Sequence, residues 1–242
     1  SLHLQLEAMK LAFADTHRYV SDPAFMELKP SDILDEKYLA GRAKLIDMKK
    51  ANNPSWGTPP KGGTIYLTAA DADGMMVSYI QSNYVSFGSG IVVPGTGIAI
   101  QNRGYCFTLE KGHPNCVGGG KRPFHTIIPA FVTKDGAPLM SFGVMGGPVQ
   151  PQGHVQMMVR MFVYRQNPQA ASDAPRWRVL QNLDVALEPG FKSGVIDELT
   201  QRGHNVTILE PKDFGGAQLI YRLDNCYCAG SDHRKDGQAV GF

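Results

Sequence analysis

The feature that most constrains this fold is a pair of β-hairpins, each closed by an Asp-Gly turn. Alternating apolar and polar residues occupy 64–71 and 75–84, with Asp73-Gly74 between them. Two further runs, 126–133 and 137–144, flank a second Asp-Gly pair in the same way. Because glycine accepts the positive φ that a tight hairpin turn needs, this pattern predicts two antiparallel strand pairs.

Helical periodicity surrounds these hairpins without alternating with them. Apolar residues recur at helical spacing over 3–18, and a second helix is expected over 31–46. The other predicted elements are helices at 150–164, 168–174 and 192–202, strands at 185–187 and 206–210, and a last hairpin joining 218–223 to 226–231. Strands grouped into hairpins, with helices before and after them, predict an α+β fold with antiparallel sheets.

Charge and hydropathy exclude several classes of function. The net charge is +2 and no basic run occurs, so we expect neither nucleic-acid binding nor a polybasic membrane surface. No apolar stretch is long enough to insert across a bilayer, and no glycine-rich phosphate-binding motif follows a strand. At 242 residues the chain can bury a substantial core, in one large domain or two small ones.

The cysteines and histidines form no recognisable framework. Cys226 and Cys228 are too close in sequence for an easy bridge, so we expect four buried, unpaired thiols, with one longer bridge as the alternative. His113 and Cys116 have the spacing of half a metal site, without a matching second half. We therefore expect no cofactor, and keep a metal-assisted hydrolase using His113, Cys116 and another histidine as an alternative.

A candidate chemical site lies at the start of the first hairpin, where Gly62-Gly63 leads into Thr64. A Thr hydroxyl is a weak nucleophile until a base takes its proton, and the residue's own α-amine can be that base once the chain is cut before it. Pro, Gly and Asn dominate residues 49–63, which predicts an exposed, flexible segment suited to cleavage. Taken alone, Gly-Gly-Thr before a strand is typical of an ordinary turn.

Motifs spread over nearly the whole chain support a functional interpretation of the Gly63–Thr64 junction. After Thr64 they are Phe87-Gly88-Ser89-Gly90, Lys121-Arg122-Pro123, Gly146-Gly147, Asp173-Ala174-Pro175-Arg176 and Gly230-Ser231-Asp232. Before it, residues 7–15 read Glu-Ala-Met-Lys-Leu-Ala-Phe-Ala-Asp. In this order and spacing the chain resembles the γ-glutamyltranspeptidase family of N-terminal-nucleophile hydrolases.

The resemblance implies a four-layer αββα sandwich made as one precursor, a zymogen that cleaves itself between Gly63 and Thr64. Residues 1–63 would be the end of the large subunit, and residues 64–242 the small-subunit catalytic region. The rest of the large subunit would be a partner from the same precursor, and without it the incomplete fold would expose sheet edges and self-associate. The resemblance also implies a bacterial protein of glutathione metabolism, in the periplasm or the cytoplasm.

The resemblance also assigns catalytic residues. Thr64 would be the nucleophile and, through its new α-amine, its own base, while Ser82 replaces a Thr whose hydroxyl bonds the nucleophile. The backbone N–H groups of Gly146 and Gly147 would form the oxyanion hole, where each donor lowers the barrier by roughly 2.7–4 kcal/mol. Pro148 follows where the family often has Ser, and because proline has no N–H it adds no third donor.

The matching substrate-binding positions depart from the family pattern. Cys106 stands where the family has the Asp that holds the substrate α-amine, while Arg103 and Tyr84 replace a Gln and an Asn. His125 and Thr126 stand where a Ser-Ser pair binds the α-carboxylate. This exchange of an anion for a cation is similar to the acylase-like branch of the family. We therefore expect Arg103 to bind a carboxylate and glutathione to be a poor substrate.

Together these residues predict an amidohydrolase or acyltransferase that forms a Thr acyl-enzyme with γ-glutamyl- or glutaryl-type amides. The expected partners are this small-molecule amide and the remaining large-subunit segment. Two alternatives stay open: the metal-assisted hydrolase described above, and a non-catalytic binding or structural module that has lost maturation.

Overall fold

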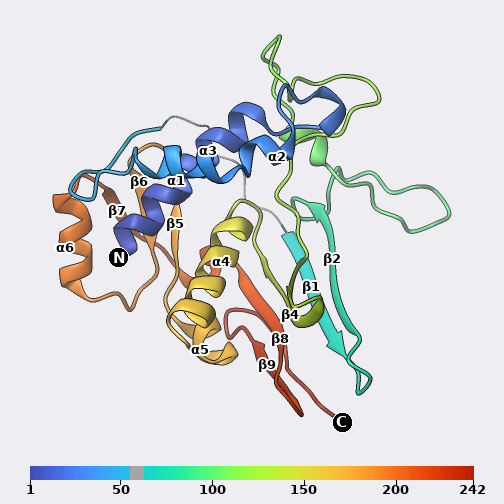
Figure 1. Cartoon of the computed structure of the whole chain (residues 1–242). Helices are drawn as coiled ribbons and strands as arrows, with labels where there is room; N and C mark the ends of the chain where they lie inside the picture. Colours follow the sequence, from blue (N-terminus) through green and yellow to red (C-terminus); the bar gives the residue numbers. More distant parts are fainter. Residues whose placement is uncertain (55–62) are drawn as a thin grey trace. The chain divides into compact units, whose positions relative to one another are not determined.

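A computed structural model describes residues 1–54 and 63–242, which form two compact units, each discontinuous in sequence (Figure 1). The described residues of unit 1 are 1–54, 103–125 and 177–208, and those of unit 2 are 63–102, 126–176 and 209–242. The predicted boundary between residues 63 and 64 concerns covalent cleavage and stays a prediction. In the residues that the structure describes, no helix combines the length and the hydropathy needed to cross a membrane.

Unit 1 is built on the long helix α1 (Leu2–Tyr19), which matches the helix expected over 3–18. Its buried side chains, among them Leu6 and Phe13, form a core with Trp177 and Val185. The sheet of this unit has the order β5-β6-β7, with β5 (Trp177–Val179), β6 (Asp184–Leu187) and β7 (Asn205–Ile208).

One pairing in this sheet was not expected. β5 and β6 are antiparallel, but β6 and β7 are parallel and are joined by the helix α6 (Ser193–Gln201). Unit 1 therefore adds one parallel pair, made through a β-α-β connection, to the antiparallel pairing expected from the sequence. Strand β5 was also missed, because three residues are too few to show a period.

The helix expected over 31–46 is in fact two short helices, α2 (Pro30–Ile33) and α3 (Glu36–Ala43), which follow the 3₁₀ turn η1 (Pro23–Phe25). Asp35 separates them, because its backbone is extended and its side chain accepts a hydrogen bond from Tyr38 N at 2.9 Å. This is the geometry of an amino-terminal cap, and it starts a new helix.

Unit 2 contains two antiparallel sheets. The first pairs β1 (Gly63–Ala70) with β2 (Met76–Tyr84). The second has the order β3-β4-β8-β9, with β3 (Ala130–Lys134), β4 (Ala137–Met145), β8 (Gly216–Arg222) and β9 (Tyr227–Ser231). Both Asp-Gly hairpins are confirmed, although β3 begins four residues later than the predicted strand. The last hairpin, β8–β9, is confirmed as well.

Two neighbouring residues of β4 show how the layers of unit 2 pack. A Cβ added to Gly143 would come within 2.6 Å of the Tyr66 ring of β1, whereas Val144 packs against Gly153 of the helix α4 (Val149–Met158). Successive residues of a strand face opposite sides of its sheet. The sheet of β4 therefore lies between the β1–β2 sheet and a helical layer of α4 and α5 (Pro168–Asp173). The α+β class is confirmed, with three of the four expected layers in unit 2.

Some local expectations need correction. The helix expected over 150–164 is α4 continued by a π-helical turn, η3 (Val159–Val163). Among the described residues the four cysteines form no disulfide bond, as expected, but none of them is buried, and Cys226 is exposed. The flexible segment expected over 49–63 lies mostly outside the described residues, yet Ala51 within it is buried and donates a hydrogen bond to Arg202 O at 2.6 Å.

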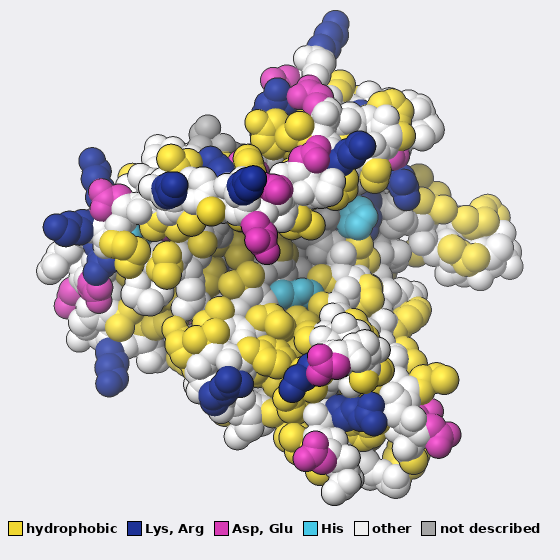
Figure 2. Space-filling model, viewed as in Figure 1, with side chains coloured by type: hydrophobic (Ala, Val, Ile, Leu, Met, Phe, Trp, Pro, Cys, Tyr) yellow, Lys and Arg dark blue, Asp and Glu magenta, His cyan; other side chains and the backbone are white. Residues whose placement is uncertain are grey.

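The outer face of the β1–β2 sheet is apolar and exposed. Tyr66 and Thr68 face β4, so alternate residues of the hairpin point the other way. On that outer face Ile65, Leu67 and Tyr79 are 72%, 48% and 48% exposed. Hydrophobic side chains are also prominent across the surface shown in Figure 2. A contiguous apolar face of this kind usually marks an interface.

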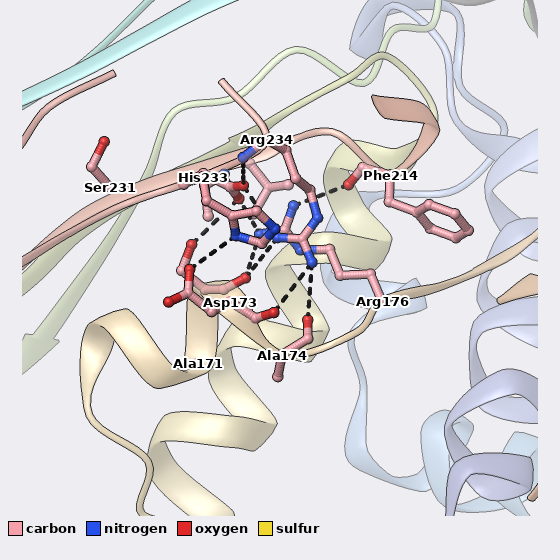
Figure 3. Close-up of polar contacts among 12 residues, drawn as sticks. Ala171, Asp173, Ala174, Arg176, Phe214, Ser231, His233 and Arg234 are labelled. Atoms are coloured by element: carbon pink, nitrogen blue, oxygen red, sulfur yellow. Dashed lines mark hydrogen bonds and ion pairs between the residues drawn. The ribbon is translucent and has the colours of Figure 1, made fainter. Parts of the chain in front are cut away.

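A buried ionic cluster ties α5, β8 and the end of β9 together within unit 2 (Figure 3). Asp232 Oδ2 accepts hydrogen bonds from Arg176 Nη2 at 2.5 Å and from Ala217 N at 2.7 Å. Its Oδ1 accepts from Arg234 N at 2.9 Å and from Arg234 Nη1 at 3.1 Å. Burial alone would raise the pKa of Asp232, but the charge of Arg176 and these donors outweigh it and lower that pKa.

Candidate active site

Thr64, the predicted nucleophile, begins β1 beside Ser82 of β2. Thr64 Oγ1 donates a hydrogen bond to Ser82 Oγ at 3.0 Å. The strand register explains the contact: Gly63 pairs with Tyr84 and Ile65 pairs with Gln81, so two residues of β2 oppose Thr64 alone. This is a β-bulge, which re-aims side chains at the end of a strand. The structure therefore brings together the two hydroxyl groups that the sequence assigned to catalysis.

The hydroxyl of Ser82 is also held by the main chain. Tyr84 N donates to Ser82 Oγ at 2.9 Å, in a backbone conformation with φ of 78° at Tyr84. Such a φ is uncommon for a residue with a side chain and is often found at functional sites. The Tyr84 side chain is only 4% exposed, so the contribution visible here is that of its backbone. Its predicted role in substrate binding stays a prediction.

Gly146 and Gly147 form the connection between β4 and α4. Both have positive φ, 131° and 63°, and a Cβ at Gly146 would lie 3.0 Å from Gly215 Cα. A residue other than glycine would be strained here. Thr126 Oγ1 donates to Gly147 O at 3.0 Å, so the structure brings Thr126 to this connection. The glycine conformations and the hydrogen bond from Thr126 therefore fix the backbone of this connection. Its role as an oxyanion hole stays a prediction.

A cavity of about 560 Å³ is lined by Thr64 and by Met145, the residue that precedes Gly146. Gln218 and residues 235–240 line it too, although none of them was predicted to belong to the site. The only available signal was the motif that begins at Gly230. A larger cavity of about 890 Å³, lined by Asp71, Arg222 and Tyr227, contains none of the predicted site residues.

Unit 1 contains three other predicted residues, Arg103, Cys106 and His125. Arg103 lies on the 3₁₀ turn η2 (Arg103–Cys106), which also contains Cys106. Burial lowers the pKa of His125, and the charges of Arg103 and Arg122 lower it further. His125 is therefore neutral at pH 7, in a region made positive by arginine. Arg122 is also engaged with Asp22, whose Oδ2 accepts a hydrogen bond from Arg122 N at 3.0 Å.

The alternative metal site at His113 and Cys116 gains no support. His113 Nε2 bonds to His17 O at 3.0 Å, and His113 Nδ1 accepts from Asn115 N at 3.0 Å. Both ring nitrogens are thus engaged within the protein. A coordinating histidine would instead leave one nitrogen to the metal.

One other group among the described residues has the spacing of metal ligands: His3, Glu7 and His204, all buried, with ligand atoms within 4.8 Å of one another. Lys10 Nζ lies 2.5 Å from Glu7 Oε1, and His3 Nδ1 lies 2.8 Å from His204 Nε2. Because the ammonium group already neutralises Glu7 and would repel a divalent cation, we interpret this group as a structural ionic cluster.

Comparison with known proteins gives a consistent result. The family described as Gamma-glutamyltranspeptidase matches residues 1–242. The chain is 36% identical to the glutathione hydrolase-like YwrD proenzyme of Bacillus subtilis, over 99% of this chain and 47% of that protein. It is 34% identical to the oxamate amidohydrolase proenzyme of Klebsiella pneumoniae, over 100% of this chain and 47% of that protein.

Among solved structures, cephalosporin acylase from Bacillus halodurans matches with a TM-score of 0.93 and 46% identity, over 100% of this chain and 45% of that chain. The chain therefore spans about half the length of these three relatives.

Proposed function

The chain belongs to the γ-glutamyltranspeptidase family, and we propose that it carries the catalytic centre of an acylase-like amidohydrolase that cleaves itself before Thr64. The observation that carries this proposal is the hydrogen bond between Thr64 Oγ1 and Ser82 Oγ. It links the two hydroxyl groups that the proposed chemistry requires, at the start of the strand where cleavage would expose a new α-amine. The matched relatives from Bacillus subtilis and Klebsiella pneumoniae are both proenzymes.

In the proposed mechanism the free α-amine of Thr64 takes the proton of its own hydroxyl. Before this transfer Ser82 Oγ, 3.0 Å from Thr64 Oγ1, holds the hydroxyl in position; as the oxygen attacks the carbonyl carbon of the amide, the Ser82 hydroxyl donates to it instead. The backbone N–H groups of Gly146 and Gly147 stabilise the negative oxygen of the tetrahedral intermediate. The amine product leaves with the proton, and an ester of Thr64 remains.

The ester then reacts with a second nucleophile. The α-amine accepts a proton from water, and the resulting hydroxide attacks the ester and releases the carboxylic acid. If an amine takes the place of water, the acyl group is transferred instead. Both outcomes regenerate the Thr64 hydroxyl and need no further reactant.

We propose that the acyl group of the substrate carries a second carboxylate, bound by Arg103 in unit 1. The region of Arg103, His125 and Arg122 is positive, and the neutral thiol of Cys106 replaces the carboxylate that would bind an α-amine. A glutaryl-type amide satisfies this arrangement, because it has the carboxylate and lacks the amine.

We also propose that the rest of the precursor covers the exposed apolar face of β1 and β2. Ile65, Leu67 and Tyr79 supply that face, and the matched relatives are about twice as long as this chain. Left uncovered, the face favours self-association.

The test of self-cleavage is the intact mass of the purified protein. We expect two fragments separated between Gly63 and Thr64, a single uncut chain for Thr64→Ala, and slower cleavage for Ser82→Ala than for the matched Ser82→Thr, which keeps the hydroxyl. A Thr64→Ala variant that still separates at this bond refutes the nucleophile assignment. An uncut wild-type precursor favours the alternative of a binding module that has lost maturation.

The test of the substrate class compares kcat/KM for glutathione with kcat/KM for a des-amino glutaryl amide, using the full precursor. We expect the glutaryl amide to be strongly preferred, and we expect Arg103→Gln to remove most of that preference. Comparable values for the two substrates contradict the proposed carboxylate specificity while leaving the Thr64 chemistry intact.

A further inference from the structure

Residues 103–125 form a long segment of unit 1 with little regular structure, and several contacts attach it to α1 and η1. His113 Nε2 bonds to His17 O at 3.0 Å, and the rings of His17 and Phe124 meet edge to face with centroids 5.6 Å apart. The main-chain N–H of Arg122 donates to Asp22. Ordering a segment of this length costs conformational entropy. These contacts offset that cost and hold the segment in one conformation.

The side chain of Asn115 joins two separate parts of this segment by hydrogen bonds. Its side chain is 7% exposed, and Nδ2 donates to Cys106 O at 2.8 Å while Oδ1 accepts from Phe124 N at 2.8 Å. Its main chain is equally engaged, since Asn115 N donates to His113 Nδ1 at 3.0 Å and Asn115 O accepts from Thr108 N at 3.1 Å. The donor and the acceptor of the amide are therefore both used, on opposite parts of the segment.

The two partners of this amide are the neighbours of the predicted substrate-binding residues. Cys106 ends the turn η2 that Arg103 begins, and Phe124 immediately precedes His125. One planar side chain therefore fixes the distance between the turn that carries Arg103 and the residue before His125. Aspartate has the same shape but no N–H, so it cannot make the bond to Cys106 O.

We propose that Asn115 is the positioning residue of a carboxylate-binding site in unit 1, a site that takes the free carboxylate of a short dicarboxylic acid or of its monoamide. The proposal rests on the substrate class inferred above and goes beyond it, because Asn115 acts through the backbone and touches no substrate. A planar guanidinium such as that of Arg103 binds a carboxylate well only when its direction is fixed. The bridge made by Asn115 supplies that direction.

The experiment measures labelling of Cys106 by a maleimide, resolved by peptide mass spectrometry, with glutarate as the probe. Cys226 and Cys228 belong to unit 2 and serve as internal references in the same sample. In the wild-type protein we expect glutarate to slow the labelling of Cys106 and to leave the two reference cysteines unchanged. Absence of this protection in the wild-type protein overturns the proposal.

In the Asn115→Asp variant we expect Cys106 to label about tenfold faster without ligand, which is the effect of losing one hydrogen bond of ordinary strength. We also expect glutarate to protect it no longer. If Asn115→Asp does not fold, the neutral Asn115→Ser variant, whose hydroxyl is too short to reach both partners, replaces it. Protection by glutarate equal to that of the wild-type protein in a folded variant overturns the proposal.

Two control variants separate positioning from other effects. Val185→Ala creates a cavity in the core of unit 1 away from residues 103–125, and we expect normal labelling and normal protection. Loss of protection in this variant overturns the proposal, because general loosening of the unit would then explain the result. Arg103→Gln is expected to lose protection by glutarate, measured against its own labelling rate without ligand.

Cleavage between Gly63 and Thr64 is read from the same samples. Protection of Cys106 in a protein that never cleaves itself supports the site and contradicts the proposed function. Cleavage without protection does the opposite, so the two failures are distinguishable.

Discussion

The two units both bury ionised groups, but they neutralise them in different ways. In unit 2 both oxygens of Asp232 accept several hydrogen bonds from Arg176, Arg234 and the main chain. In unit 1 Glu7 faces Lys10 and lies 3.7 Å from His204, whose Nδ1 is buried with no hydrogen-bond partner among the described residues. The first cluster is fixed in one charge state, whereas the second contains groups that can lose or gain a proton.

The largest effect is expected for Asp232→Asn. Each carboxylate oxygen accepts at least two donors, so an amide in either orientation turns its NH₂ group toward donors and leaves Arg176 or Arg234 without an anion. Removing one partner of a buried ion pair costs about 3–5 kcal/mol. The measurement is the free energy of unfolding in urea.

The matched control is Asp173→Asn, since the Asp173 side chain is 46% exposed and pairs with the exposed His233. Exposed pairs contribute about 0–1 kcal/mol. If Asp232→Asn is as stable as this control, the buried cluster does not stabilise unit 2 in the way described.

A smaller effect is expected for Glu7→Gln, the corresponding change in unit 1. Burial lowers the pKa of Lys10, although Glu7 opposes that shift, so Lys10 can become neutral when its anion is removed. We expect a loss of about 1–3 kcal/mol, the cost of an impaired buried hydrogen bond and not of a stranded charge. A loss as large as that of Asp232→Asn would erase the difference between the two clusters.

The pH dependence of the free energy of unfolding should reveal the lowered pKa of His204. Burial, followed by the charges of Lys10, His3 and Arg202, lowers the pKa of His204 to about 4. In the unfolded chain histidine titrates near 6.5, so the unfolded state binds the proton more readily and the stabilisation is complete only above about pH 6.5. It declines below that pH and is lost near pH 4, with about 2 kcal/mol gone at pH 5.

The measurement is the free energy of unfolding between pH 7 and pH 4.5. His154 in unit 2 also has a pKa lowered to about 4 by burial, so part of the slope is common to every variant. The His204→Gln variant should show a shallower slope than the wild-type protein, because it lacks the imidazole whose pKa is lowered. Equal slopes for the wild-type protein and His204→Gln would contradict the assignment.

The sequence predicted unit 2 better than unit 1, for a physical reason. The hairpins of unit 2 are specified locally, because Asp-Gly turns and alternating residues lie within about twenty positions of each other. In unit 1 the short strands β5 and β6 are buried against α1, which lies more than 150 residues earlier in the chain. No local period can report a contact of that kind.

The candidate site residues differ in the same way, because some contacts follow from local strand pairing and others depend on an irregular segment. The contact of Thr64 with Ser82 follows from the pairing of two consecutive strands, so the resemblance and the hairpin pattern were enough to anticipate it. Asn115 was not anticipated, because its partners Cys106 and Phe124 are chosen by the path of an irregular segment. A short polar residue in such a segment has no distinguishing pattern in the sequence.

The smallest effect is expected for Asp35→Ala. This variant tests whether a local signal, the cap made by Asp35, separates α2 from α3 in unit 1. Loss of the cap on Tyr38 N costs about 1 kcal/mol, but alanine has the highest helix propensity and favours joining α2 to α3. Because α3 has no buried residues, packing does not oppose that change. We expect a net loss below about 1 kcal/mol, with a small gain of helix by circular dichroism, and no change for Asp35→Asn, which keeps a capping oxygen. A loss of helix would show that contacts beyond the cap separate the two helices, so that even here unit 1 is specified by its tertiary structure.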